Sequence, residues 1–280
     1  MLAVSTDVPD EATRAAVLAL AARIEAEDGA PPLSDQTLTQ LRSRAVTHAT
    51  TRAGGQLVGY AQREGDAAEI AGTTESLEPL LAAISVPALR VWSHGRRSRL
   101  RTVLPAHGFS PVRELYQLRR PLTDLPDDPP LPDGVIVRAF ERGRDEDAWL
   151  AINASAFAGH PEQGRWRRPD LEARMAEPWF DPAGFLLAER GSELVGFHWT
   201  KIHPDGTGEV YVLGISPAAQ GAGLGNALLV RGLRHLAKRG CPTVLLYVDG
   251  DNPAALRLYA RAGFAEHDLD VQWQLGSRPS

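Results

Sequence analysis

The two halves of this chain resemble each other, and this repetition constrains the fold more than any other feature of the sequence. The stretch "QLVGYAQREGDAAEIAG", which begins at Gln56, corresponds to "ELVGFHWTKIHPDGTGEVYVLG", which begins at Glu193. Later in each half, "VWSHGRRSRLRTVLPAHGF" corresponds to "LYVDGDNPAALRLYARAGF". The repeating unit is far longer than the ~20 to 50 residues of a solenoid repeat. The sequence therefore predicts that a whole domain is duplicated within the 280 residues.

A proline-rich segment separates the two halves. The stretch "RRPLTDLPDDPPLPDGV", Arg119 to Val135, holds five prolines and four aspartates. This composition suits a stiff, extended connector and does not suit the interior of a helix or sheet. We therefore expect a first domain at residues 1–120, a linker at 121–134 and a second domain at 135–280.

Composition excludes several classes of partner. The net charge is -5 and the basic residues are scattered, so the basic stripe of a nucleic-acid surface is not expected. A single cysteine, Cys241, excludes an internal disulfide, and no apolar run reaches the ~20 residues of a membrane span. The first 30 residues carry acids early and indicate an amphipathic helix, not a signal peptide. We expect a cytoplasmic monomer.

The hydrophobic pattern of the second half predicts an α/β fold. Its elements follow the order strand, helix, three strands, helix, strand, helix, strand. We expect strands at 134–140, 184–190, 194–202, 208–216, 243–249 and 265–275, and helices at 145–157, 225–240 and 252–263. This order indicates a mixed sheet with helices on both faces.

A glycine loop, "QGAGLG", connects the strand at 208–216 to the helix at 225–240. A nucleotide-triphosphate loop would continue with Lys and Ser or Thr, whereas Gly225 is followed by Asn226 and Ala227. A dinucleotide-binding loop would need its third glycine at Asn226. The remaining explanation is a pyrophosphate held by backbone amides at the start of a helix, where the helix dipole favours negative charge.

This loop and the later segment "DNPAALRLYARAGF" resemble the GCN5-related N-acetyltransferases. The acetyl-CoA loop of that family has the form Gln/Arg-x-x-Gly-x-Gly/Ala, which Gln220, Gly223 and Gly225 match. The resemblance implies two tandem domains of this type, each with a mixed, twisted sheet flanked by helices, and acetyl-CoA as the acetyl donor. The residues it implies for acetyl-CoA binding are Leu213, Gly214, Ile215, Gln220, Gly221, Ala222, Gly223, Leu224, Gly225, Asn226, Asn252, Pro253, Ala254, Ala255, Leu256 and Arg257.

The resemblance also implies two catalytic residues. An amine attacks a thioester only when it is neutral, so a general base must remove a proton from its ammonium form. Glu209 occupies the position of that base, acting directly or through water, and Tyr259 that of the acid that protonates the departing thiolate. No metal is expected, because His160, His198 and His203 have no cysteine or carboxylate partners at a spacing typical of metal ligands. These histidines are interpreted as packing or solvent-facing residues.

The whole chain looks more narrowly like the tandem members of this family that acetylate the cysteinyl amine of cysteinyl-glucosaminyl-inositol. By this resemblance, the acceptor contacts are Asp35, Glu162, Lys201, Glu209 and Tyr247. Asp35 departs from the pattern, since the relatives usually have Glu there. For Asp35 and Glu162 the alternative is a helix cap or a solvated loop acid.

The first half departs most from the family pattern. After Glu69 the chain continues with "IAGTTESLEPLLAAI", which contains no phosphate-binding loop. We expect a degenerate domain that supports the second one and contributes Asp35 to the acceptor pocket.

Two alternative functions stay open at this stage. One is a related enzyme that acetylates a peptide N-terminus or an aminoglycoside, and the other is a non-catalytic acyl-CoA sensor. The presence of both Glu209 and Tyr259 argues against the sensor. Through the resemblance alone, the acidic and lysine positions of the acceptor set argue against the other acceptors.

Overall fold

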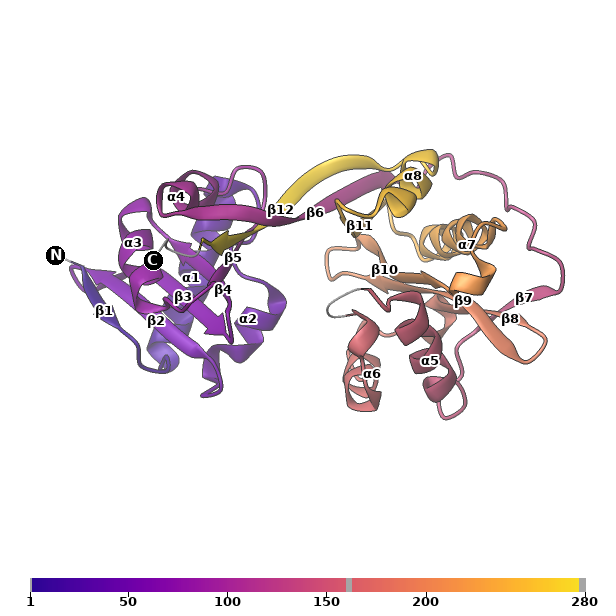
Figure 1. Cartoon of the computed structure of the whole chain (residues 1–280), viewed down its shortest axis with the longest axis horizontal. Helices are drawn as coiled ribbons and strands as arrows, with labels where there is room; N and C mark the ends of the chain where they lie inside the picture. The colour runs from indigo at the N-terminus through magenta and orange to yellow at the C-terminus, as the bar shows by residue number, and fades with distance from the viewer. Residues whose placement is uncertain (1, 160–162, 277–280) are drawn as a thin grey trace. The chain divides into compact units, whose positions relative to one another are not determined.

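The computed structural model describes residues 2–159 and 163–276 (Figure 1). Two compact units are present. Unit 1 contains the described residues up to Tyr116, Asp249–Asp251, and those from Asp268 onward, and unit 2 contains those of Gln117–Val248 and Asn252–His267. The last strand of the chain therefore contributes to unit 1, although it follows unit 2 in sequence.

The secondary structure of the two units is as follows. The strands are β1 (Ala3–Ser5), β2 (Thr47–Ala53), β3 (Gln56–Glu64), β4 (Ala67–Gly72), β5 (Arg90–Ser93), β6 (Phe109–Pro121), β7 (Val135–Ala139), β8 (Phe185–Arg190), β9 (Glu193–Ile202), β10 (Gly208–Ile215), β11 (Thr243–Asp249) and β12 (Ala265–Leu275). The helices are α1 (Glu11–Asp28), α2 (Asp35–Thr39), α3 (Thr74–Ala83), α4 (Leu100–Ala106), α5 (Glu146–Ala156), α6 (Arg168–Met175), α7 (Leu224–Lys238) and α8 (Pro253–Arg261).

The order of these elements confirms the predicted duplication. The series β2-β3-β4-α3-β5-α4-β6 recurs as β8-β9-β10-α7-β11-α8-β12. Every element expected for the second half is present at the expected place. The short helix α6 was not expected, and neither was the strand β1 before the predicted N-terminal helix.

Unit 1 is a sheet with a helix on each face. Its strands follow the order β1-β2-β3-β4-β5-β12. Neighbouring side chains of β4 lie on opposite faces of the sheet. Ile70 packs in the hydrophobic cluster with residues of α3, and Ala71 packs in the cluster with residues of α1. The edge beside β5 is completed by the end of the chain, where Val271 of β12 pairs with Ser93 of β5. The indole of Trp273 donates a hydrogen bond to the Ser93 hydroxyl at 2.9 Å, so this pairing is also held by side chains.

Unit 2 has the strand order β6-β11-β10-β9-β8-β7. Helix α7 covers one face of the sheet, and α5 and α6 cover the other (Figure 1). The core under α5 is aromatic: Trp149 contacts Phe185, Phe197 and Trp199 edge to face, at ring-centroid distances of 5.6, 5.4 and 5.7 Å. This arrangement fixes the start of β8 and the middle of β9, and β9 pairs with β10.

The predicted connector is partly incorrect. We expected no sheet between Arg119 and Val135, but β6 continues through Pro121. The strand continues because Leu118 and Arg120 are buried, and the Arg120 guanidinium donates to the backbone carbonyl of Ala262. Residues 122–134 contain neither helix nor strand, as expected of this segment.

His198 connects β9 to α7 through a buried hydrogen bond. Its ring is fully buried, and Nδ1–H donates to the Leu228 carbonyl oxygen at 2.9 Å. Burial lowers the pKa of His198 to about 4, so the ring is neutral at neutral pH. This confirms the interpretation of His198 as a packing residue.

Gly232→Ala tests this contact. A Cβ on Gly232 would lie 2.0 Å from Cε1 of His198, so the helix or the ring must shift. Overpacking of this kind costs about 1–3 kcal/mol of unfolding free energy, measured by urea denaturation. Gly225→Ala is the control, because its Cβ would meet Ile215 at an ordinary 3.6 Å, and we expect that variant to be at least as stable as the wild type. Equal stability of the two variants would contradict the account.

Candidate active site

The parallel strands β10 and β11 separate at Glu209. They pair only through Gly208 with Val244 and Glu209 with Leu245. Directly after this point β10 has a bulge, and its register with β9 shifts between Val210 and Val212. The described pairing between β10 and β11 ends there, so the remainder of β10 can offer backbone groups to a ligand.

The glycine loop follows β10 and leads into α7. Gly221 and Gly223 have φ of 82° and 84°, in the left-handed region that favours glycine. Gly225 has no such requirement, and a Cβ there would make ordinary contacts, so the three glycines are not equivalent. The side chain of Gln220 donates to the Ile215 carbonyl at 3.3 Å and thereby ties the loop to the end of β10.

The first turn of α7 is suited to an anion. Gly223 is the N-cap of α7, and among the described residues no side chain caps this helix. The first N–H groups of a helix have no acceptor within it, and the helix dipole adds positive potential at that end. The exposed backbone from Gly221 to Gly223 lets a phosphate approach closely.

The Glu209 side chain is only 9% exposed, and its contacts are polar. His203 Nε2 lies 2.7 Å from Glu209 Oε2, and Lys201 Nζ lies 3.8 Å from the same oxygen. The interpretation of His203 as a packing or solvent-facing residue was therefore wrong, because the β9–β10 turn brings its ring to the carboxylate. The spacing of His203 and Glu209 along the chain does not indicate this contact, because the turn between β9 and β10 produces it.

Two aromatic rings surround Lys201 and were not predicted. The ammonium lies 5.2 Å from the ring centroid of Trp179 and 5.8 Å from that of Tyr211. Burial raises the pKa of Tyr211 to about 12, so its hydroxyl is protonated at neutral pH. Tyr211 lies in the bulge of β10, where simple alternation along a strand fails to predict which way a side chain points.

Helix α8 lies beside the glycine loop. A Cβ on Gly225 would come within 3.7 Å of Leu258, which places α8 against the start of α7. The Asn252 side chain caps α8 by accepting a hydrogen bond from the Ala255 N–H at 3.1 Å. Tyr259 is buried against Phe264, and burial raises the pKa of its hydroxyl, which therefore stays protonated. Arg257 is exposed on the same helix.

The predicted acceptor residues are distributed as follows. Lys201 adjoins Glu209, and Tyr247 on β11 is 44% exposed, with its hydroxyl accepting from the Gln117 amide at 2.8 Å. Asp35 is the exposed first residue of α2 in unit 1, where Ser34 and not Asp35 is the N-cap. Glu162, like His160, lies outside the described residues. The roles of all these residues remain predictions.

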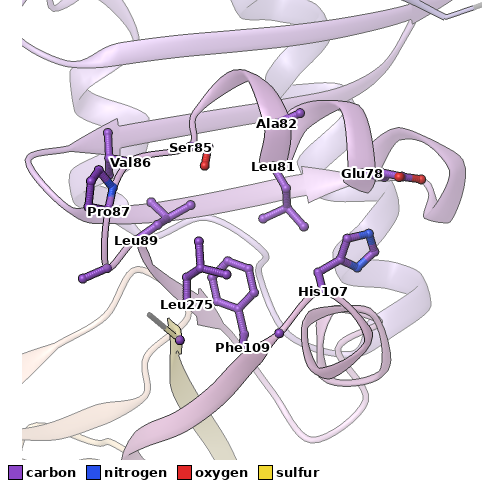
Figure 2. A pocket seen from close by; sticks show the side chains of 13 residues that line it. Glu78, Leu81, Ala82, Ser85, Val86, Pro87, Leu89, His107, Phe109 and Leu275 are labelled. Carbon is purple, nitrogen blue, oxygen red and sulfur yellow. The ribbon is translucent and has the colours of Figure 1, made fainter. Parts of the chain in front are cut away.

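Unit 1 contains a separate hollow of about 1010 Å³ (Figure 2). Leu81, Leu89, Phe109 and Leu275 line it, at the end of α3 and the start of β5. Its lining is mainly apolar and lies at the far end of α3 from the position equivalent to the glycine loop. The hollow therefore does not fit the phosphates of acetyl-CoA.

Comparison with known proteins identifies the family. Residues 148–264 match the Acetyltransferase (GNAT) family. The mycothiol acetyltransferase of Streptomyces avermitilis is 50% identical over 281 residues, covering 94% of this chain and 91% of its own length. This chain belongs to the mycothiol acetyltransferase family. It is therefore an N-acetyltransferase, which confirms the predicted enzyme class and removes the acyl-CoA sensor as an alternative.

Solved structures agree with the tandem fold. A GCN5-related N-acetyltransferase from Sphaerobacter thermophilus has a TM-score of 0.73 at 23% identity, covering 98% of this chain and 95% of that one. A tandem GNAT protein from the clavulanic acid biosynthesis pathway has a TM-score of 0.72 at 18% identity, covering 100% of both chains. These likenesses confirm the predicted fold class of two GNAT domains.

Within residues 2–159 and 163–276, no helix has the length and apolar character needed to cross a membrane. The same residues contain no group of three or more His, Cys, Asp or Glu side chains placed to hold a metal ion.

Gly223→Val tests the loop assignment. A branched side chain at a φ of 84° strains the loop and projects where the phosphate is expected, so the dissociation constant for acetyl-CoA should rise at least ~10-fold. Gly240→Val is a matched control, since Gly240 has a φ of 85° and open space around it but follows the other end of α7. Calorimetry should show normal acetyl-CoA binding for Gly240→Val only. Unchanged binding by a folded Gly223→Val protein would show that the loop holds another ligand.

Proposed function

We propose that this chain transfers the acetyl group of acetyl-CoA to the cysteinyl amine of cysteinyl-glucosaminyl-inositol, which gives mycothiol. One observation carries the proposal: Glu209 lies where β10 and β11 separate, on the strand that leads into the uncapped start of α7. A base, a strand that is unpaired on its β11 side and an anion site thus follow one another along one stretch of chain. The name of the Streptomyces avermitilis relative supports the choice of acceptor.

The binding of acetyl-CoA follows from this order of parts. The loop from Gln220 to Asn226 surrounds the pyrophosphate with backbone amides, and Asn252 to Arg257 flank it on α8. The backbone of Leu213 to Ile215 pairs with the pantetheine arm. The arm lies on the side of β10 where β11 no longer pairs with it. The thioester then lies toward Glu209.

The chemistry uses two side chains. Glu209 removes a proton from the acceptor ammonium, and the neutral amine attacks the thioester carbonyl carbon. The carbon–sulfur bond then breaks, Tyr259 donates its proton to the departing thiolate, and the second proton that the nitrogen loses as the amide forms restores the Tyr259 hydroxyl. Burial raises the pKa of Tyr259, so this hydroxyl carries a proton at neutral pH and can act as the donor.

The acceptor pocket combines charge with polar groups. Glu209, Lys201 and Tyr247 contact the acceptor in this proposal. Carboxylates suit the cationic amine, while the hydroxyl and ammonium groups suit the hydroxyls of the sugar and the inositol. We further propose a monomer that works in the cytoplasm, the reducing compartment to which a chain with one buried cysteine is suited.

We propose that unit 1 does not bind acetyl-CoA, and its differences from unit 2 support this. The β3–β4 hairpin places Ala67 opposite Glu64, at the position where Glu209 lies opposite Lys201 in β9–β10. Strand β4 has no register shift against β3, and it pairs with β5 over three residues. Only Thr73 separates β4 from α3, so there is no loop to surround a phosphate.

The first prediction from this comparison is one acetyl-CoA site per chain. Titration calorimetry of the whole protein should give a stoichiometry near one, and Gly223→Val should abolish that single transition. Two sites of similar affinity would contradict the assignment of unit 1 as degenerate.

The second prediction concerns the base. Glu209→Gln keeps the size and hydrogen-bonding capacity of the side chain but removes its basicity, so turnover should fall by ~100- to 10000-fold. Acetyl-CoA binding should barely change, and the acidic limb of the pH–rate profile should shift or vanish. A near-normal turnover with an unaltered profile would place the base elsewhere.

The choice of acceptor is tested separately, with wild-type protein and a panel of amines. Acetyl-CoA turnover should be fastest with cysteinyl-glucosaminyl-inositol and slow with an aminoglycoside or a peptide N-terminus. Preferred turnover of either of the last two would replace the proposed acceptor but would leave the transferase chemistry in place.

A further inference from the structure

The turn between β9 and β10 holds His203 in a defined position. The N–H of His203 donates to the Thr207 carbonyl at 2.8 Å, and the N–H of Gly206 donates to the His203 carbonyl at 2.9 Å. The Asp205 carboxylate accepts from the backbone N–H and from the hydroxyl of Thr207, at 2.9 and 3.0 Å. Gly206 has a φ of 85°, which favours glycine at this position. The turn is therefore fixed by its own hydrogen bonds, and the imidazole extends from it to Glu209.

The contact makes the two oxygens of Glu209 unequal. His203 Nε2 lies 2.7 Å from Oε2, and Lys201 Nζ also approaches Oε2, at 3.8 Å. Among the hydrogen bonds and ion pairs of the described residues, none uses Oε1. An ionised carboxylate can only accept hydrogen bonds, so Nε2 of His203 must carry the hydrogen.

We infer that His203 is a positioning residue for the base: its ring donates Nε2–H to Oε2 of Glu209, fixes the carboxylate, and leaves Oε1 to take the proton of the acceptor ammonium. This inference rests on the proposed function of Glu209. In the step, an N–H bond of the ammonium breaks, an O–H bond forms at Oε1, and the electron pair stays on the nitrogen. Neither His203 nor Lys201 exchanges a proton in this step.

Other ionisable side chains lie close to His203 and Glu209, and the variants used in a test must leave them unchanged. Lys201 on β9 and Tyr211 on β10 lie beside Glu209, and Asp205 acts on His203 from within the turn. Arg174 and Glu177 act in turn on Tyr211. On the β11 side the residue paired with Glu209 is Leu245, which does not titrate.

Kinetics of two His203 variants test the role. His203→Ala removes the donor, and kcat/KM for the acceptor should fall about 10- to 100-fold, as expected for a lost hydrogen bond to a charged group. His203→Gln can place its amide Nε2 near the original donor, so it should restore most of the rate. Full activity of His203→Ala, or an equal loss in both variants, would overturn the inference.

Controls separate this role from folding. His107→Ala replaces an exposed histidine of unit 1 and should leave the kinetics unchanged. Acetyl-CoA affinity and the thermal unfolding midpoint of both His203 variants should stay close to those of the wild type. A loss of acetyl-CoA binding in parallel with the loss of turnover would indicate a general structural defect and would contradict a specific role.

A measurement that needs no acceptor provides the second test. Nitrogen-15 NMR of the ring should show the Nε2–H tautomer for His203 in the free wild-type protein, and a changed signal in Glu209→Gln. The Nδ1–H tautomer, or a signal insensitive to Glu209→Gln, would overturn the inference. If wild-type protein fails to acetylate cysteinyl-glucosaminyl-inositol, the proposed function is wrong. The spectrum still shows whether His203 donates its Nε2–H to Glu209.

Discussion

The separation of β10 from β11 directly after Glu209 is the constraint on which the rest of the site depends. A parallel strand normally satisfies its backbone groups on both sides, and here β10 does so only through Gly208 and Glu209 on the β11 side. The bulge that follows redirects the strand while its pairing with β9 continues to Ile215. The open side of β10, the carboxylate at its start and the loop at its end are thus consequences of one backbone feature.

The core of unit 2 supports this feature. Tyr211, in the bulge, contacts Trp199 and Trp179 at ring-centroid distances of 5.3 and 5.0 Å. Trp199 in turn stacks on Phe185 at 4.3 Å. The aromatic cluster therefore connects the packing of α5 and the sheet to the residues around Lys201. Strands β9 and β10 connect the aromatic core to the site, so a substitution in the aromatic cluster should change the position of Glu209.

The two copies share an order of strands and helices but differ in the side chains at corresponding strands. Unit 1 keeps the strand and helix order, but a cluster of internal ion pairs lies at its β4 and β5 strands. His94 lies 3.0 Å from Asp270 and 3.4 Å from Glu69. Burial lowers the pKa of His94, but its contacts with Asp270 and Glu69 outweigh burial and raise the pKa to about 10. The charged histidine and the two carboxylates thus form ion pairs with one another inside unit 1.

The sequence by itself determined the duplication, the order of elements and the location of the glycine loop, because these follow from local periodicity and from the backbone freedom of glycine. It also indicated Glu209 and Tyr259, whose roles remain predictions. Only the tertiary structure showed that Gly221 and Gly223, but not Gly225, need a left-handed backbone. Only the structure placed His203 on Glu209 and paired Val271 with Ser93 of the other copy. The reason is physical: such contacts depend on strand register, on a bulge and on pairing between residues far apart in the chain, none of which is encoded in the spacing of neighbouring residues.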